Sequence, residues 1–207
     1  MIAVIDYDAG NIRSVEKALA FLGEEVCISA DPEVILSADA AILPGVGAFG
    51  VAMDRLRERG LDRVVSEFVL SEKKPFLGIC LGLQLLFEKS EEDPEAEGLS
   101  LLKGKIRRIP SEGGRKVPQI GWNSLSFPKE SRLFQGIPEG SYVYFVHSYY
   151  LDAGDRDVVA AETEYGVTIH AAVENGNLFA CQFHPEKSGA VGLQILRNFI
   201  GVVKGKC

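Results

Sequence analysis

The sequence predicts an α/β protein with a central mixed, mostly parallel sheet that is flanked by helices and extended by antiparallel β additions in its second half. In the first half, strand-like and helix-like segments alternate, which is typical of parallel strands joined by crossover helices. In the second half, the segments are shorter and rich in β-branched and aromatic residues, which favours further strands. The 207 residues, 46% of them hydrophobic, suffice for one sizeable core. We therefore expect a single domain that spans residues 1–207.

The first half begins with an apolar run that we expect to be a strand, and strands and helices then alternate along most of it. The expected strands are residues 1–6, 25–29, 40–43 and 75–79, and the expected helices are 12–22, 49–59, 61–72 and 80 to about 90. The acidic run at residues 91–97 is expected to be a mobile, solvated loop without a chemical role.

The second half is expected to hold six short strands and a closing helix. The strands are residues 105–109, 124–127, 142–149, 158–163, 168–174 and 178–183, and the helix is 191–202. Asn175, Gly176 and Asn177 predict a hairpin turn between the last two strands. Lys103, Lys105, Arg107 and Arg108 form a basic cluster at the first of these strands. The period-2 placement of Lys103, Lys105 and Arg107 indicates one exposed, solvated face.

The composition disfavours several classes of function. A net charge of -7 argues against binding to a nucleic-acid backbone. No apolar run approaches the roughly 20 residues that span a membrane, and the N-terminus lacks the basic start of a signal peptide. We therefore expect a cytoplasmic protein. Cys27, Cys80, Cys181 and Cys207 form no CxxC pair and show no zinc spacing. No disulfide framework, metal site or cofactor is expected from them.

Cys80 lies where an apolar strand-like stretch meets a helix-like one, with Gly78 and Gly82 on either side. This pattern is typical of a nucleophile elbow with cysteine in place of serine, because the sharp turn pushes the side chain into a strained position that bulky neighbours would block. The helix N-terminus after the turn favours the thiolate, which is the reactive form. An alternative interpretation is a small buried hydrophobe at a tight β-α turn.

A nucleophilic thiol needs a base, and His184 is the best placed of the three histidines. It ends an apolar strand pattern and precedes Pro185, which favours an extended backbone at His184. In an extended chain, Glu186 shares a face with His184 and can hold one ring nitrogen, leaving the other to transfer a proton. An isolated His-Pro-Glu sequence would indicate only a strand-end histidine beside a solvated carboxylate.

A glycine-rich loop follows the strand expected at 40–43, and it includes Gly45 and Gly47. Glycines at a strand end allow backbone N–H groups to face a cleft. An oxyanion formed by thiolate attack on an amide is stabilised by such donors, each worth about 100- to 1000-fold in rate. The natural donors are the N–H of Leu81 and one from the loop. Taken alone, this loop is a weak signal, because glycine turns after strands are common.

Together, the elbow at residues 78–82 and the His-Pro-Glu sequence at 184–186 resemble the class I, or triad, glutamine amidotransferases. The resemblance implies the fold of that class and hydrolysis of glutamine through a cysteinyl thioester by Cys80, His184 and Glu186. It further implies an oxyanion hole at Val46, Gly47 and Leu81, and glutamine-binding groups at Gly45, Gln84, His147, Ser148 and Tyr149. Taken alone, Gln84 could be an ordinary helix residue and His147 a hydrogen-bonded core histidine.

Within that class, segments 10–15, 44–49, 116–123 and 144–149 resemble the glutaminase subunits of imidazole glycerol phosphate synthases. This resemblance implies a heterodimer with a cyclase subunit of barrel fold. That partner would use the ammonia on a phosphoribulosyl formimino aminoimidazole carboxamide ribotide. Its products would be imidazole glycerol phosphate, for histidine biosynthesis, and aminoimidazole carboxamide ribotide. The candidate docking residues, all expected outside the triad, are Asn11, Pro118, Trp122 and Tyr144.

Two departures from this pattern, Gln119 and the pair Asp8-Ala9, are expected to affect only the details of docking. Trp122 could also be a core aromatic residue, although tryptophan is enriched at interface hot spots. Two other functions stay open. One is the glutaminase subunit of another class I complex, such as those of anthranilate or pyridoxal phosphate synthesis, and the other is a non-catalytic binding module of the same fold.

Overall fold

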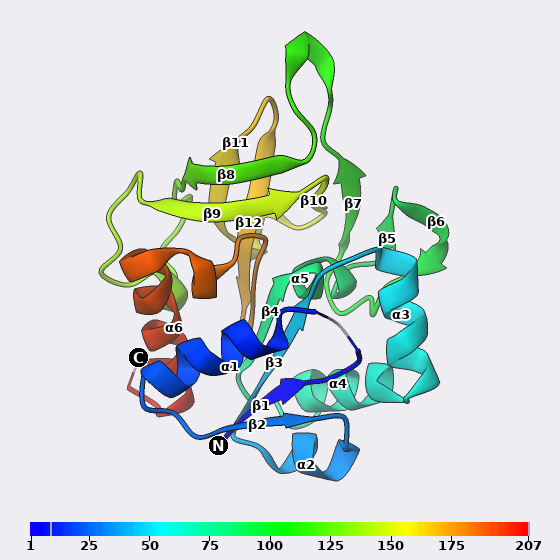
Figure 1. The fold of residues 1–207 in the computed structure, drawn as a ribbon, viewed down its shortest axis with the longest axis vertical. Helices are drawn as coiled ribbons and strands as arrows, with labels where there is room; N and C mark the ends of the chain where they lie inside the picture. The colour runs from blue at the N-terminus through cyan, green and yellow to red at the C-terminus, as the bar shows by residue number, and fades with distance from the viewer. Residues whose placement is uncertain (9, 207) are drawn as a thin grey trace.

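The computed structural model describes residues 1–8 and 10–206, so Ala9 and Cys207 lie outside the described residues. Within this part of the chain, a seven-stranded sheet runs in the order β11-β12-β13-β4-β3-β1-β2 (Figure 1). Strands β2, β1, β3, β4 and β13 are parallel, and β12 and β11 extend the sheet through antiparallel pairs. The predicted mixed, mostly parallel sheet is confirmed. Its strands are β1 (Ile2–Ile5), β2 (Val26–Ser29), β3 (Ala40–Gly45), β4 (Phe76–Cys80), β11 (Val159–Glu164), β12 (Thr168–Asn175) and β13 (Leu178–Cys181).

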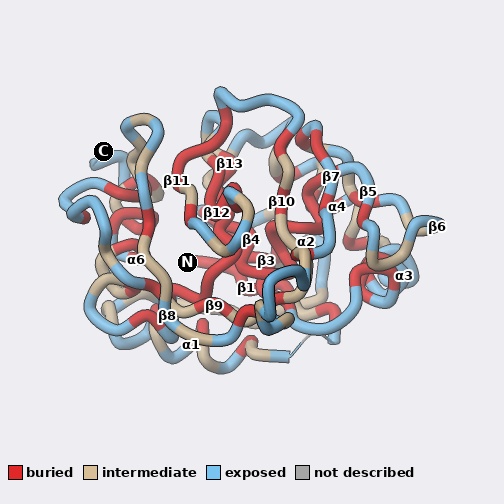
Figure 2. The backbone as a smooth tube through the Cα atoms, turned by 90° about the horizontal axis from the view of Figure 1, so that it is seen from above, coloured by how far each residue is buried: buried red, intermediate tan, exposed pale blue. Residues whose placement is uncertain are grey.

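Helices cover both faces of this sheet, because successive side chains of a strand point to opposite faces. On β1, Ala3 and Ile5 belong to the core under α2, α3, α4 and α5, whereas Ile2 and Val4 belong to the core under α1 and α6. Figure 2 shows the central strands buried between these layers. The helices are α1 (Ile12–Phe21), α2 (Pro32–Ser37), α3 (Phe49–Glu58), α4 (Leu61–Leu70), α5 (Leu81–Leu85) and α6 (Gly189–Val203).

Two smaller sheets stand beside the main one (Figure 1). One has the order β10-β7-β5-β6 and the other pairs β8 with β9. The predicted strand at 142–149 is therefore divided at Ser148, with β9 and β10 in different sheets. Their strands are β5 (Lys89–Ser90), β6 (Asp93–Glu97), β7 (Gly104–Arg108), β8 (Gln119–Ser124), β9 (Tyr142–His147) and β10 (Tyr149–Ala153).

The helix after the elbow is shorter than predicted, and the acidic run is not a free loop. Helix α5 ends at Leu85 because the chain returns and occupies the carbonyls that a longer helix would use. The Leu85 carbonyl accepts from the Leu99 N–H at 2.8 Å, and the Leu86 carbonyl from the Leu101 N–H at 2.9 Å. The expected solvated loop at 91–97 contains β6, which pairs with β5.

The strand predicted at 124–127 is also wrong, since β8 lies at Gln119–Ser124 and Ser126 makes only an isolated bridge to Glu162. The alternation along β7 is confirmed, with Lys105 and Arg107 exposed around buried Ile106.

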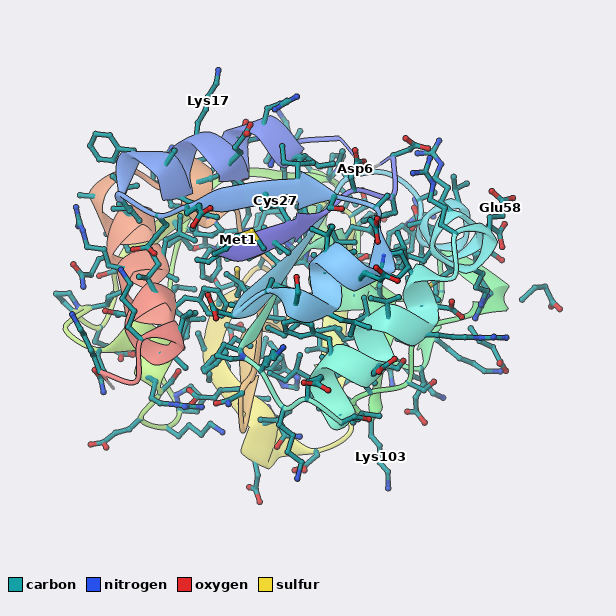
Figure 3. The ribbon with its side chains drawn as sticks, turned by 90° about the horizontal axis from the view of Figure 1, so that it is seen from below. Met1, Asp6, Lys17, Cys27, Glu58 and Lys103 are labelled. Carbon is teal, nitrogen blue, oxygen red and sulfur yellow. The ribbon has the colours of Figure 1, made fainter. Side chains whose placement is uncertain are left out.

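Side chains of Lys17, Glu58 and Lys103 point away from the body of the molecule (Figure 3). Among residues 1–8 and 10–206, no helix is long and apolar enough to cross a membrane.

Candidate active site

Cys80 occupies a sharp turn between β4 and α5 with φ 55° and ψ -107°, a conformation that L-residues rarely adopt. The two flanking glycines are required by close backbone approach. A Cβ on Gly82 would lie 1.8 Å from the Leu43 carbonyl oxygen, and a Cβ on Gly78 would lie 2.7 Å from the Gly82 carbonyl oxygen. The thiol is 6% exposed. The predicted elbow is present in the structure.

His184 is brought to Cys80 by the parallel pairing of β13 with β4, in which Cys181 lies beside Ile79. Both strands therefore end at the same edge of the sheet. The backbone N–H of His184 donates to the Tyr144 carbonyl at 3.0 Å, which attaches the loop after β13 to β9. The ring is held by Glu186, whose Oε1 lies 2.8 Å from His184 Nδ1. Both side chains are buried.

The electrostatics of the pair favour an imidazolium. Burial lowers the pKa of His184, but hydrogen bonding and charge interactions with Cys80 and Glu186 outweigh it and raise the pKa to about 9. Because Nδ1–H of His184 donates a hydrogen bond to the Glu186 carboxylate, Nε2 is the nitrogen that exchanges a proton with the sulfur. In the described part of the chain, Nε2 makes no hydrogen bond of ordinary geometry.

Asn11, one of the docking candidates, is not a member of the triad but contacts two of its residues directly. Its Nδ2 donates to Glu186 Oε1 and lies 3.4 Å from His184 Nδ1. The backbone of Asn11 is left-handed, with φ 74°, at the start of α1. No sequence spacing signals this contact, because Asn11 and Glu186 are 175 residues apart.

A cavity of about 290 Å³ opens in front of the thiol. Nearly all of the predicted oxyanion and substrate groups line it, together with Glu92, Pro118 and Val146. Its lining consists of Val46, Gly47, Cys80, Leu81, Gln84, Glu92, Pro118, Val146, His147, Ser148 and Tyr149.

Gly45 lies outside this lining, at the buried end of β3 beside Cys80. A Cβ there would lie 2.2 Å from the hydroxyl oxygen of Tyr7, which itself donates to the Pro44 carbonyl at 2.9 Å. Burial raises the pKa of Tyr7, so the phenol stays protonated and can donate. Gly45 thus allows the close packing that sets the position of the glycine-rich loop. In that loop, Gly47 has φ 112°, a conformation that favours glycine.

Glu92 is a site residue that the sequence did not reveal, because it lies in the run interpreted as a solvated loop. Its Oε2 accepts from the backbone N–H of Phe49 at 2.8 Å, at the start of α3. The backbone N–H of Glu92 donates to Ser90 Oγ at 3.1 Å. These contacts hold a carboxylate at the cavity, where it can pair with an ammonium group.

Two further polar groups of the cavity, Gln84 and His147, share the Tyr149 carbonyl as a hydrogen-bond partner. It accepts from Gln84 Nε2 at 3.0 Å and lies 2.8 Å from His147 Nδ1. Burial lowers the pKa of His147 to about 4, so this ring is neutral at pH 7. Its Nε2 lies 3.0 Å from the side-chain amide of Gln119, which is buried behind the cavity rather than exposed for docking.

The family Glutamine amidotransferase class-I matches residues 3–202 of the chain. The chain belongs to this family. A protein of Thermosynechococcus vestitus, described as imidazole glycerol phosphate synthase subunit HisH, is 54% identical over 205 residues, which cover 98% of this chain and 97% of that protein. A Bacillus cereus protein of the same description is 52% identical over 204 residues, covering 99% and 96%.

Solved structures agree with this amidotransferase fold. A crystal structure described as glutamine amidotransferase has a TM-score of 0.77 at 22% identity, covering 99% of this chain and all of that one. A chain of the PurLQS structure from Thermotoga maritima has a TM-score of 0.76 at 21% identity, covering 98% of both chains. These likenesses concern the fold alone.

In this class I amidotransferase, one of the other docking candidates, Pro118, lines the cavity, and two, Trp122 and Tyr144, lie on the β8–β9 pair. Trp122 on β8 is 54% exposed. The Trp122 ring contacts that of Tyr144 edge-on, with centroids 6.1 Å apart. Trp122 is therefore not a core aromatic residue. Within the described residues, no cluster of three or more His, Cys, Asp or Glu side chains is placed to hold a metal ion.

Proposed function

We propose that the chain is the glutaminase subunit of an imidazole glycerol phosphate synthase. It hydrolyses glutamine to glutamate and ammonia and passes the ammonia to a cyclase subunit in histidine biosynthesis. The observation that carries this proposal is the buried His184–Glu186 pair that interacts with Cys80, which itself lines a cavity of about 290 Å³. The 54% and 52% identity to proteins described as subunits of that synthase supports the choice of complex.

The first half of the reaction forms a thioester. The Cys80 thiolate attacks the side-chain carbonyl carbon of glutamine, and the carbonyl oxygen becomes an oxyanion. The N–H of Leu81 and one from Val46 or Gly47 bind this oxyanion, since these residues line the cavity beside the sulfur. The C–N bond then breaks, and His184 gives its Nε2 proton to the departing ammonia.

The second half releases glutamate. Water attacks the thioester carbon while Nε2 of His184 accepts a proton from it, and Glu186 stabilises the imidazolium that forms. The C–S bond breaks and the Cys80 thiolate is restored. Each round therefore returns both members of the Cys80–His184 pair to their starting states.

The cavity has groups for the other end of glutamine. The Glu92 carboxylate suits the α-ammonium group, and Gln84, Ser148 and Tyr149 supply polar atoms along the same wall. The neutral His147 holds the Tyr149 carbonyl in place through Nδ1. In this scheme, Glu92 and Gln84 set affinity, and the triad performs the chemistry.

One apolar face of the β8–β9 pair fits the partner subunit. Ile120 and Trp122 point to the same side, and Tyr144 lies opposite Trp122 across the pair. Exposed fractions are 63% for Ile120, 54% for Trp122 and 58% for Tyr142. Val146, opposite Ile120, also lines the cavity, so a partner on this face would cover the site where ammonia leaves.

A cyclase of barrel fold on this face would complete a heterodimer, in which the present chain acts as one domain over residues 1–207. Direct transfer keeps the ammonia from being protonated and lost in bulk water. We place this complex in the cytoplasm.

Ammonia release from glutamine tests the proposal, measured with the purified chain alone and with the cyclase subunit and its nucleotide ligand. We expect low release alone, a sharp increase with the liganded partner, and none from Cys80→Ala. Cys27→Ala is the matched control, because Cys27 lies on the edge strand β2 and should retain activity. Trp122→Ala should weaken partner binding about tenfold or more.

Two outcomes would contradict the proposal, each in a different part. A folded chain that releases no ammonia under any condition would overturn the glutaminase assignment. High activity that does not respond to the partner would retain the glutaminase but contradict the assignment to this synthase.

A further inference from the structure

A buried glutamine outside the triad touches the nucleophile. Gln182, which follows β13, is 0% exposed, and its side-chain Nε2 lies 3.6 Å from Cys80 Sγ. This is hydrogen-bond distance for a sulfur acceptor. The backbone N–H of Gln182 donates to the Ala171 carbonyl at 2.8 Å, which fixes the residue against β12. A buried amide fixed in this way cannot easily turn away from the sulfur.

The direction of this hydrogen bond follows from a chain of contacts that begins at an unambiguous acceptor. The Tyr149 carbonyl can only accept, so the group of Gln84 that lies 3.0 Å from it is the amide nitrogen. That nitrogen also lies 3.0 Å from Gln182 Oε1, which must therefore be the oxygen of the second amide. The remaining group of Gln182 is its NH₂, and it faces the Cys80 sulfur.

We infer that Gln182 is a further catalytic residue, whose amide N–H donates to the Cys80 sulfur and is oriented for this by Gln84. The inference rests on the proposed glutaminase mechanism. A donor aimed at the sulfur stabilises the thiolate over the thiol, because hydrogen bonds to a charged group are stronger than those to a neutral one. It increases the fraction of thiolate available for attack, and it receives the thiolate again when the C–S bond of the thioester breaks.

The same contacts link the substrate cavity to the nucleophile. Gln84 lines the cavity, and one nitrogen of its amide donates both to the Tyr149 carbonyl and to Gln182. A substrate that moves Gln84 therefore also changes the orientation of the amide at the sulfur. His184 lies on the loop after β13, and its interactions with Cys80 raise its pKa, so the thiolate has a positive charge nearby in addition to one neutral amide donor.

The test is the pH dependence of Cys80 alkylation by iodoacetamide, followed by mass spectrometry of the peptide that contains Cys80. Neither glutamine nor the partner is present, so the result is independent of the glutaminase assignment. Gln182→Met keeps the length of the side chain and removes the donor. We expect the midpoint of the rate profile to rise by about one pH unit, so that the rate below the midpoint falls about tenfold.

Asn198→Leu is the matched control, because Asn198 is another buried amide, on α6, that donates to the carbonyls of Leu133 and Gln135. Its alkylation midpoint should equal that of the wild type. An unchanged midpoint in Gln182→Met, or an equal rise in both variants, would overturn the inference. In the ammonia assay with partner, Gln182→Met should lower kcat more than it raises KM.

If Gln182→Met does not fold, the wild-type protein still decides the question. The side-chain amide protons of Gln182, observed by NMR, should shift with pH at the midpoint found for Cys80 alkylation, and Cys80→Ala should abolish this shift. Amide signals that do not respond to pH or to the removal of the sulfur would overturn the inference.

Discussion

His147 lines the thiol cavity and His184 interacts with Cys80 itself, and their surroundings give the two rings opposite properties. His184 and His147 are both buried, at 1% and 6% exposure. Burial lowers the pKa of both, yet that of His184 is raised to about 9 by its contacts with Cys80 and Glu186, and that of His147 falls to about 4. The difference shows that the charge of the partners, rather than the depth of burial, decides which ring can transfer protons.

The largest effect on kcat is expected from a comparison of two single variants, each of which lacks one of the two rings. His184→Asn should lower kcat for ammonia release by about 100- to 10,000-fold, because the proton donor to the leaving group is lost. His147→Gln should change kcat by less than about tenfold and act mainly on KM, because this neutral ring holds the Tyr149 carbonyl and the Gln119 amide rather than transferring a proton. Steady-state kinetics with the liganded partner measure both. Equal losses of kcat would contradict the division of roles.

The next effect is expected from Glu186→Gln, which keeps the shape of the side chain and removes its charge. The pKa of His184 should fall from about 9, because one of the interactions that raise it is lost. A drop of about 100-fold or more in kcat should accompany it, since the imidazolium is no longer stabilised. NMR titration of the His184 ring follows the first effect. A ring that still titrates near 9 would show that Glu186 does not set its charge.

A smaller effect is expected from Asn11→Ala. The variant removes one donor to Glu186 Oε1 and leaves the direct His184–Glu186 contact intact. One hydrogen bond to a charged group corresponds to about tenfold in kcat. Ser14→Ala, on the same helix, serves as the control in the same assay, because Ser14 meets Asn11 through its backbone N–H, which the substitution keeps. A loss of partner binding without a change in kcat would assign Asn11 to docking instead.

Local patterns made much of this fold and site predictable. The elbow could be recognised because glycines must stand within two residues of Cys80, where a Cβ would strike backbone. His184 and Glu186 could be paired because their contact spans two residues. The parallel strands could be recognised because alternating strands and helices encode them.

Other features depend on contacts between distant segments, and no local pattern encodes them. Asn11 reaches Glu186 across 175 residues, and Gln182 reaches Cys80 across 102. Glu92 lies in a run whose composition is that of a solvated loop, but pairing with β5 places it at the cavity. Helix α5 ends early only because the segment near Leu99 occupies its carbonyls.

The smallest effect is expected in the stability of the folded chain, and it sharpens the contrast between the two rings. The pKa of His147 is about 4 in the folded state and near 6.5 when unfolded, so the unfolded chain binds more protons between these values. The contribution of His147 to the free energy of unfolding is therefore full above pH 6.5 and is lost as the pH falls toward 4. His184 has the opposite sign, with a contribution that is full below pH 6.5 and is lost as the pH rises through about 9.

Each ring contributes a slope of at most about 1.4 kcal/mol per pH unit to the free energy of unfolding. Urea unfolding at a series of pH values should therefore show His147→Gln differing in slope from the wild type between pH 4 and 6.5, and His184→Asn between pH 6.5 and 9. The two pH windows meet near the pKa of histidine in the unfolded chain, because folding lowers the pKa of His147 and raises that of His184. Slopes that change in the same window for both variants would mean that the two environments are not opposed.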